Sequence, residues 1–149
     1  MKKYYLIFLY LLLSISVKAA LVDVKTNLWS GTQEMNATWS NWVSVAANNF
    51  TNAEVGNTIS VSISKTSSSS ALIMLNTGTW KAMPDAESGK TIGEIPCEIK
   101  WKITSTMLKE LKANGLIVKG ISYTVTSIDL IHQVKTSDEE KGNPVTNVW

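Results

Sequence analysis

The feature that most constrains the fold of this chain is a period-two alternation of apolar and polar residues in several short segments. Ile99, Trp101 and Ile103 alternate with charged residues, so their side chains share one face. Residues 43–47 and 59–63 alternate in the same way between apolar and small residues. Successive side chains of a strand point to opposite faces, so this pattern predicts strands with one face in a core.

One segment follows the period of a helix instead. Residues 105–114 are predicted to form a short α-helix, with Ser105 or Thr106 as its N-terminal cap. Gly115 follows the last turn, where a residue that tolerates positive φ is favoured. The apolar stripe of this helix consists of Met107, Leu108 and Leu111.

The number and spacing of these segments predict the fold class. Further strands are expected at residues 71–75, 116–120 and 122–131, which gives about eight short strands with one short helix. No strand–helix–strand rhythm is present, so an all-β fold, an antiparallel β-sandwich, is expected. The sandwich domain is predicted to span residues 21–134, followed by a polar tail or linker at residues 135–149.

The N-terminal segment has the features of a secretory signal peptide, predicted at residues 1–19. Two lysines precede an apolar run at residues 4–15, and small residues allow cleavage after Ala19 or Ala20. The run is shorter than the roughly 20 residues that span a bilayer, so no membrane span is expected after cleavage. We expect export to the periplasm, the cell surface or the extracellular medium.

The charge of the chain argues against a nucleic-acid partner. Without Lys2, Lys3 and Lys18 of the leader, 11 of the 14 basic residues remain against 12 acidic ones, a net charge of −1. All 14 basic residues are lysines, so arginine, the usual bidentate phosphate ligand, is absent. A basic nucleic-acid-binding surface is therefore not expected.

The sequence gives little support for a catalytic site or a metal-binding site. Cys97, the single cysteine, is expected to be half-buried, and His132 is the only base available to it. One histidine excludes the usual zinc sites, and nothing supports a bound calcium ion or a cofactor. Glu34 or Asp85 would serve a hydrolase, but neither lies in an apolar segment that would raise its pKa. No catalytic or metal-binding residues are predicted.

The tryptophans carry the functional signal, because an indole face suits the C–H face of a sugar ring. Trp101 is expected in the core, Trp29 in the core or at a strand end, and Trp149 in the tail. Trp42 is out of phase with the inward-facing Val43 and is expected to face outward. The predicted glycan-binding residues are Trp39, Trp42 and Trp80 for stacking, with Asn36, Asn41, Asn76 and Asp85 as hydrogen-bonding partners.

Several motifs resemble the small β-sandwich modules found beside glycoside hydrolases in Bacteroidetes polysaccharide-degrading proteins. The motifs lie at residues 28–31, 39–50, 53–59, 78–84, 106–120 and 123–131. This resemblance implies a jelly-roll, galactose-binding-domain-like fold and a carbohydrate-binding role. It also implies a glycan as the ligand and a glycoside hydrolase or a cell-surface protein as a partner.

The sequence thus favours a non-catalytic, secreted carbohydrate-binding module. The alternative is a structural or protein-interaction β-sandwich of the cell surface, in which Trp39, Trp42 and Trp80 pack loops onto the sandwich and bind no glycan. Exposure of these three side chains, and their convergence on one site, would distinguish the two.

Overall fold

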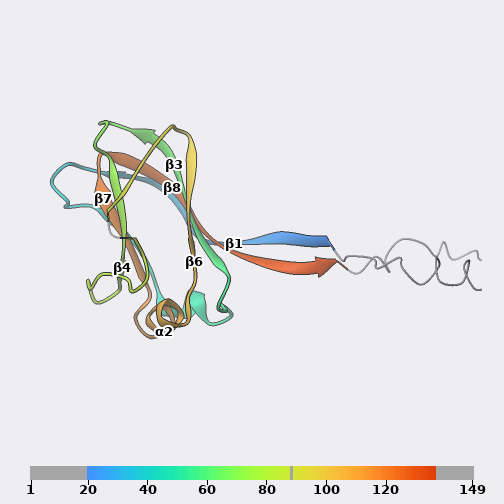
Figure 1. Ribbon diagram of the computed structural model, residues 1–149. Helices are drawn as coiled ribbons and strands as arrows, with labels where there is room; N and C mark the ends of the chain where they lie inside the picture. Colours follow the sequence, from blue (N-terminus) through green and yellow to red (C-terminus); the bar gives the residue numbers. More distant parts are fainter. Residues whose placement is uncertain (1–19, 88, 137–149) are drawn as a thin grey trace, which may run out of the picture. The chain divides into compact units, whose positions relative to one another are not determined.

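The computed structural model describes residues 20–87 and 89–136, in which eight strands form two antiparallel four-stranded sheets (Figure 1). The strand order is β1-β8-β3-β6 in one sheet and β2-β7-β4-β5 in the other. The predicted all-β class with about eight strands and one short helix is confirmed. The strands are β1 (Ala20–Met35), β2 (Trp42–Val45), β3 (Thr58–Thr66), β4 (Leu72–Thr77), β5 (Lys90–Thr91), β6 (Cys97–Lys102), β7 (Leu116–Ile121) and β8 (Tyr123–Thr136).

The chain divides into two compact units. The unit Asp23–His132 contains the body of both sheets, a 3-10 helix η1 (Ala47–Phe50) and the helix α2 (Ser105–Asn114). In the other unit, the structure describes the first residues of β1 and the last residues of β8, where the hydroxyl of Thr136 donates to the carbonyl of Ala20.

Some predictions fall on residues that the structure does not describe. The predicted signal peptide at residues 1–19 lies outside the described residues, as do residues 137–149 of the predicted tail, Trp149 included. Within residues 20–87 and 89–136, no helix has the length and apolar character needed to cross a membrane.

The period-two alternation of the strands determines which of their residues form the core of the sandwich. Ile99 and Trp101 of β6 are buried while the charged residues between them are exposed, so the predicted core position of Trp101 is confirmed. In the register of β3, Ile59 lies opposite Trp101 on one side and Leu130 of β8 on the other. Side chains of both sheets therefore meet in one apolar cluster between the layers.

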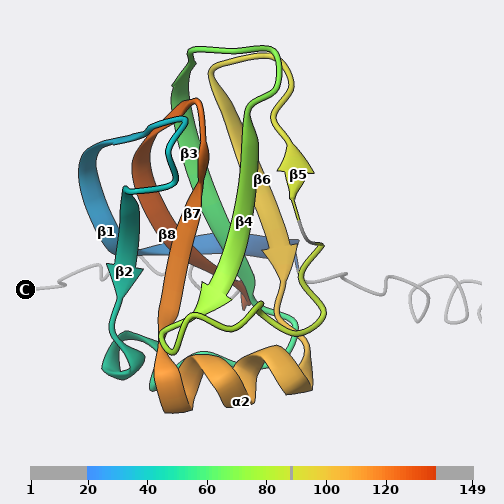
Figure 2. The ribbon, with the colours of Figure 1, turned by 90° about the vertical axis from the view of Figure 1, so that its left-hand side faces the viewer.

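Helix α2 occupies the predicted residues and lies across one end of the sandwich (Figure 2). Met107 and Leu111 are buried, as its apolar stripe predicts. The predicted cap at Ser105 or Thr106 is wrong, because the hydroxyl of Thr104 accepts the hydrogen bond from the backbone N–H of Met107 at 3.1 Å. Thr104, Ser105 and Thr106 are consecutive residues with a hydroxyl group, and the first of them is the N-terminal cap of the helix.

Strand lengths differ from those that the sequence predicts. β1 begins at Ala20, so Trp29 lies within the strand rather than at its start, where it is half-buried against the core. β8 continues to Thr136, five residues beyond the predicted end. The two-residue strand β5 was not predicted, since two polar residues carry no detectable alternation.

Candidate functional site

Three exposed tryptophans come together on the outer side of the β2-β7-β4-β5 sheet. Trp39, Trp42 and Trp80 are 41%, 45% and 49% exposed. The rings of Trp42 and Trp80 meet edge to face, with centroids 4.8 Å apart and planes at 79°. The ammonium of Lys119 lies 5.9 Å from the ring centroids of both Trp39 and Trp80. We call these four residues the tryptophan cluster.

Strand pairing explains why the cluster forms here. Trp42 of β2 lies opposite Lys119 of β7, which in turn lies opposite Met74 of β4. Directly opposed residues of adjacent strands share one face of a sheet, so these three form a row across the outer face. The neighbouring pair, Val43 and Val118, turns inward and is buried, which confirms that Trp42 faces outward.

The loop after β4 places Trp80 over this row. The backbone N–H of Trp80 donates to the carbonyl of Thr77 at 2.9 Å, and that of Thr77 donates to the carbonyl of Lys81 at 2.8 Å. Trp80 has a φ of 68°, and Asn76 beneath it is buried. The side-chain amide of Asn76 donates to the carbonyl of Trp80 at 2.8 Å, so this predicted sugar-binding residue holds the loop in place.

The loop before β2 places Trp39 in a similar way. Trp39 has a φ of 60°, and its backbone N–H donates to the carbonyl of Asn36. The side chain of Asn36 bonds to both the hydroxyl and the backbone N–H of Ser40. The amide of Asn41 donates to the carbonyl of Glu34 at 2.9 Å. Asn36 and Asn41 thus shape the loop that carries Trp39.

The backbone around Lys119 is fixed from the core side. Tyr123 is buried, and its hydroxyl donates to the backbone carbonyl of Lys119 at 3.0 Å. Burial raises the pKa of Tyr123 above its ordinary value of 10.0, so the phenol stays protonated as a donor. Lys119 itself is half-buried and was not predicted as a site residue.

The fourth polar candidate, Asp85, bonds to the residue that caps the N-terminus of α2. Its carboxylate accepts a hydrogen bond from the hydroxyl of Thr104 at 2.7 Å, and that hydroxyl caps α2. The loop from Trp80 to Asp85 lies beside a pocket of about 480 Å³. The pocket is lined by Thr77, Thr79, Lys81, Ala82, Pro84, Thr106, Glu110 and Asn114. Since Thr79 and Lys81 flank Trp80, the pocket adjoins the loop that carries the tryptophan.

The groups weighed for catalysis come from three separate segments: Glu34 from β1, Asp85 from the loop after β4, and Cys97 from β6. Glu34 and Asp85 are both exposed. Cys97 is half-buried at the start of β6, as predicted, and burial raises the pKa of its thiol, which makes it a weaker nucleophile. Within the described part of the chain, no three His, Cys, Asp or Glu residues are grouped to hold a metal ion.

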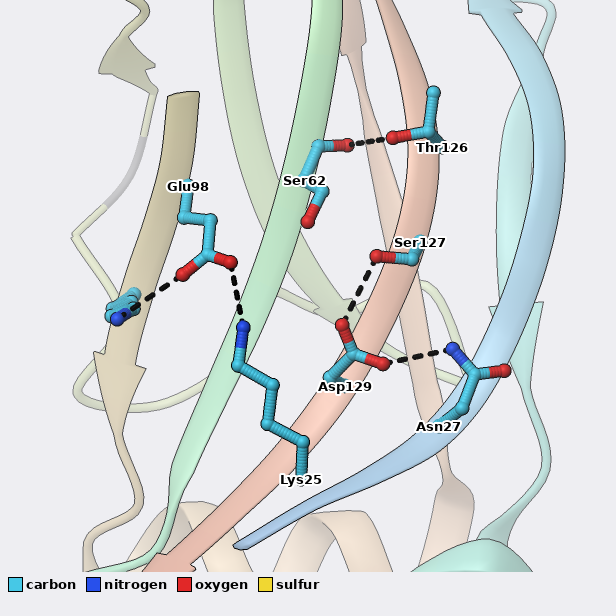
Figure 3. A network of polar contacts seen from close by, with 8 residues as sticks. Lys25, Asn27, Ser62, Glu98, Thr126, Ser127 and Asp129 are labelled. Atoms are coloured by element: carbon cyan, nitrogen blue, oxygen red, sulfur yellow. Dashed lines mark hydrogen bonds and ion pairs between the residues drawn. The ribbon is translucent and has the colours of Figure 1, made fainter. Parts of the chain in front are cut away.

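The outer face of the other sheet is polar and internally paired (Figure 3). Nζ of Lys25 lies 2.7 Å from one carboxylate oxygen of Glu98, and Nζ of Lys100 lies 3.1 Å from the other. Asp129 is buried and accepts a hydrogen bond from the side-chain amide of Asn27 at 2.8 Å. Lys25, Lys100 and Glu98 therefore neutralise one another on this face, and Asp129 is held by neutral donors.

The pairing of Glu98 makes part of the stability depend on pH. The hydrogen bonds from Lys25 and Lys100 hold the pKa of Glu98 below its ordinary value of 4.5. A carboxylate with a lowered folded-state pKa stabilises the fold above the unfolded-state value and loses this contribution as the pH falls through the folded-state pKa. We expect wild type to be more stable than Glu98→Gln at neutral pH, with the difference shrinking below pH 4.5.

Urea unfolding at a series of pH values measures this difference. Glu94→Gln is the matched control, because Glu94 is exposed and forms no ion pair with any described residue. A constant difference between wild type and Glu98→Gln across the acid range would contradict a stabilising role for the ion pairs.

Comparison with known proteins gives one informative result. No family model and no curated protein sequence matches this chain. The fold is similar to that of SGBP-B from the mixed-linkage glucan utilization locus of Bacteroides ovatus, solved in complex with a mixed-linkage heptasaccharide. The TM-score is 0.59 at 22% sequence identity, and the match covers 71% of this chain and 28% of that one. At this identity the match shows the shared β-sandwich fold alone.

Proposed function

We propose that this chain is an exported, non-catalytic carbohydrate-binding module that binds a polysaccharide or oligosaccharide on the tryptophan cluster. The observation that carries the proposal is the convergence of Trp39, Trp42 and Trp80, each exposed by 41% or more, from two loops and a strand. Single exposed apolar residues are ordinary on protein surfaces, whereas a contiguous aromatic group marks a binding site.

The chemistry of the cluster suits a sugar. Indole faces offer apolar contact and a π surface to the C–H face of a pyranose ring. The ammonium of Lys119 can donate hydrogen bonds to hydroxyl or ring oxygens beside the rings. Asn36, Asn41 and Asn76 already support the two loops, so in this proposal they act mainly by holding the tryptophans. Asp85 is a candidate for contact with a longer glycan near the adjoining pocket.

The fold supports the same proposal. SGBP-B, which shares the sandwich fold, was solved with an oligosaccharide bound. The match covers 28% of SGBP-B, so the likeness concerns only part of that protein. A glycoside hydrolase or a cell-surface protein is the proposed partner, in line with the motifs noted in the sequence.

Trp80→Ala tests the proposed site. It removes the ring that meets Trp42 edge to face, and we expect glycan affinity to fall by about 2 kcal/mol, or about thirtyfold in Kd. Affinity electrophoresis in polysaccharide gels identifies a ligand. Calorimetry with oligosaccharides, among them a mixed-linkage heptasaccharide, then gives the affinity of each variant.

Val55→Ala is the control, because Val55 is 59% exposed and is not a residue of the tryptophan cluster. It should bind glycan like wild type. If Trp80→Ala folds and also binds like wild type, the tryptophan cluster is not the site. If wild type binds no glycan and indole fluorescence is unmoved by sugars, the protein-interaction alternative is favoured.

A further inference from the structure

Lys119 has an unusual electrostatic environment. Lys90 and Lys119 are the half-buried lysines of the described chain, and Nζ of Lys90 lies 3.8 Å from the carboxylate of Glu87. Lys119 forms no ion pair with any described carboxylate, and its ammonium lies against the rings of Trp39 and Trp80. Aromatic faces hold a cation without neutralising it, and a partly desolvated charge attracts an anion more strongly than a charge in water.

The strand positions around Lys119 contribute no negative charge. In the strands β2, β4, β5 and β7, every other described position on this outer face is neutral. Trp42 and Met74 flank Lys119 in its row, and the remaining positions are Ser44, Leu72, Asn76, Thr91, Ile117 and Ile121. The exposed Lys81, next to Trp80, adds a second positive charge. The opposite sheet differs, since Lys25 and Lys100 there form ion pairs with the carboxylate of Glu98.

We propose that the tryptophan cluster selects acidic glycans, with Lys119 binding a carboxylate or sulfate group on the sugar. This inference rests on the proposed function and adds the chemical class of the ligand. A sugar stacked on Trp39 or Trp80 brings its ring substituents beside the ammonium, which lies at the same distance from both rings. A charge-assisted hydrogen bond is about twice as strong as a neutral one, so an anionic substituent gains most from this position.

Matched pairs of oligosaccharides test the inference, because the two members of each pair share one sugar backbone and differ only at the substituent that carries the charge. One pair is an oligogalacturonate and its methyl ester, and the other is a sulfated carrageenan oligosaccharide and its desulfated form. In at least one pair we expect the acidic member to bind about fivefold more tightly at low salt. This ratio should narrow as ionic strength rises, and the pair that shows it distinguishes a carboxylate from a sulfate.

Lys119→Met assigns the preference to one residue, since it keeps the apolar stem and removes the charge. We expect it to reduce the affinity for the acidic member to that for the neutral member. Lys112→Met, an exposed position on α2, is the control and should keep the wild-type ratio. A preference that survives Lys119→Met would overturn the assignment.

The outcomes separate this inference from the proposed function. If neutral oligosaccharides bind and neither acidic member binds more tightly, the selection of acidic glycans is wrong and the carbohydrate-binding function stands. If neither pair binds and no neutral oligosaccharide binds, both are overturned.

Discussion

Gly115→Ala is expected to lower the free energy of unfolding by about 2–5 kcal/mol. Gly115 joins α2 to β7 with a φ of 76° and a ψ of −162°, a conformation essentially confined to glycine that costs a residue with a β-carbon about 1–2 kcal/mol. The added methyl group would also overlap the backbone carbonyl of Val45, and overpacking of this kind costs about 1–3 kcal/mol more. Urea unfolding followed by circular dichroism measures the loss.

Substitutions at two other glycines separate the conformational cost of Gly115→Ala from its steric cost. Gly89 has a φ of 67° but no atom within 4 Å of an added Cβ, so Gly89→Ala should show the conformational cost alone. Gly93 has open space and no positive φ, so Gly93→Ala should match wild type within about 0.5 kcal/mol. Equal stability of Gly115→Ala and Gly93→Ala would contradict the close approach of the helix end to β2.

Gly78→Ala is expected to disturb the tryptophan cluster without altering any of its side chains. Gly78 lies in the loop between β4 and Trp80, and a methyl group there would overlap the backbone carbonyl of Asn114 at the end of α2. The loop must then move away from the helix, which shifts Trp80 relative to Trp42. We expect a stability loss of about 1–3 kcal/mol and a fall in glycan affinity of about tenfold or more.

Nuclear magnetic resonance of the indole N–H groups gives a direct readout for Gly78→Ala. The signals of Trp42 and Trp80 should move, because each ring lies within 4.8 Å of the other and alters its magnetic environment. Gly93→Ala should leave both signals in place. Unmoved signals in a folded Gly78→Ala variant would contradict the role of this contact in positioning Trp80.

The fold was predictable where a pattern repeats within a few residues. The alternation around Trp101 placed that ring in the core, and the stripe of Met107 and Leu111 defined α2. Strand ends were less predictable, since β8 reaches Thr136 through polar residues that also suit a linker. The cap at Thr104 depends on where the chain turns after β6, which no local pattern records.

The site was predictable in part. The outward orientation of Trp42 was predictable from Val43, because neighbouring side chains of a strand point to opposite faces and Val43 is buried. Lys119 was missed since it is a single lysine in an otherwise apolar strand, and only the pairing of β7 with β2 places the lysine among the tryptophans. Asn76 was predicted as a hydrogen-bonding partner of a glycan, and its amide bonds to the backbone carbonyl of Trp80, a contact that sequence spacing cannot reveal.

The left-handed backbone of Trp39 and Trp80 has a consequence for the kinetics of binding. Bulky residues rarely adopt a φ of 60° or 68°, so both loops are held in an unusual conformation by the hydrogen bonds of the folded chain. The entropy of fixing the backbone of the two loops is therefore lost during folding and not when a ligand arrives. Encounter with a sugar should need no loop rearrangement, and variants of the site should differ in residence time rather than in association rate.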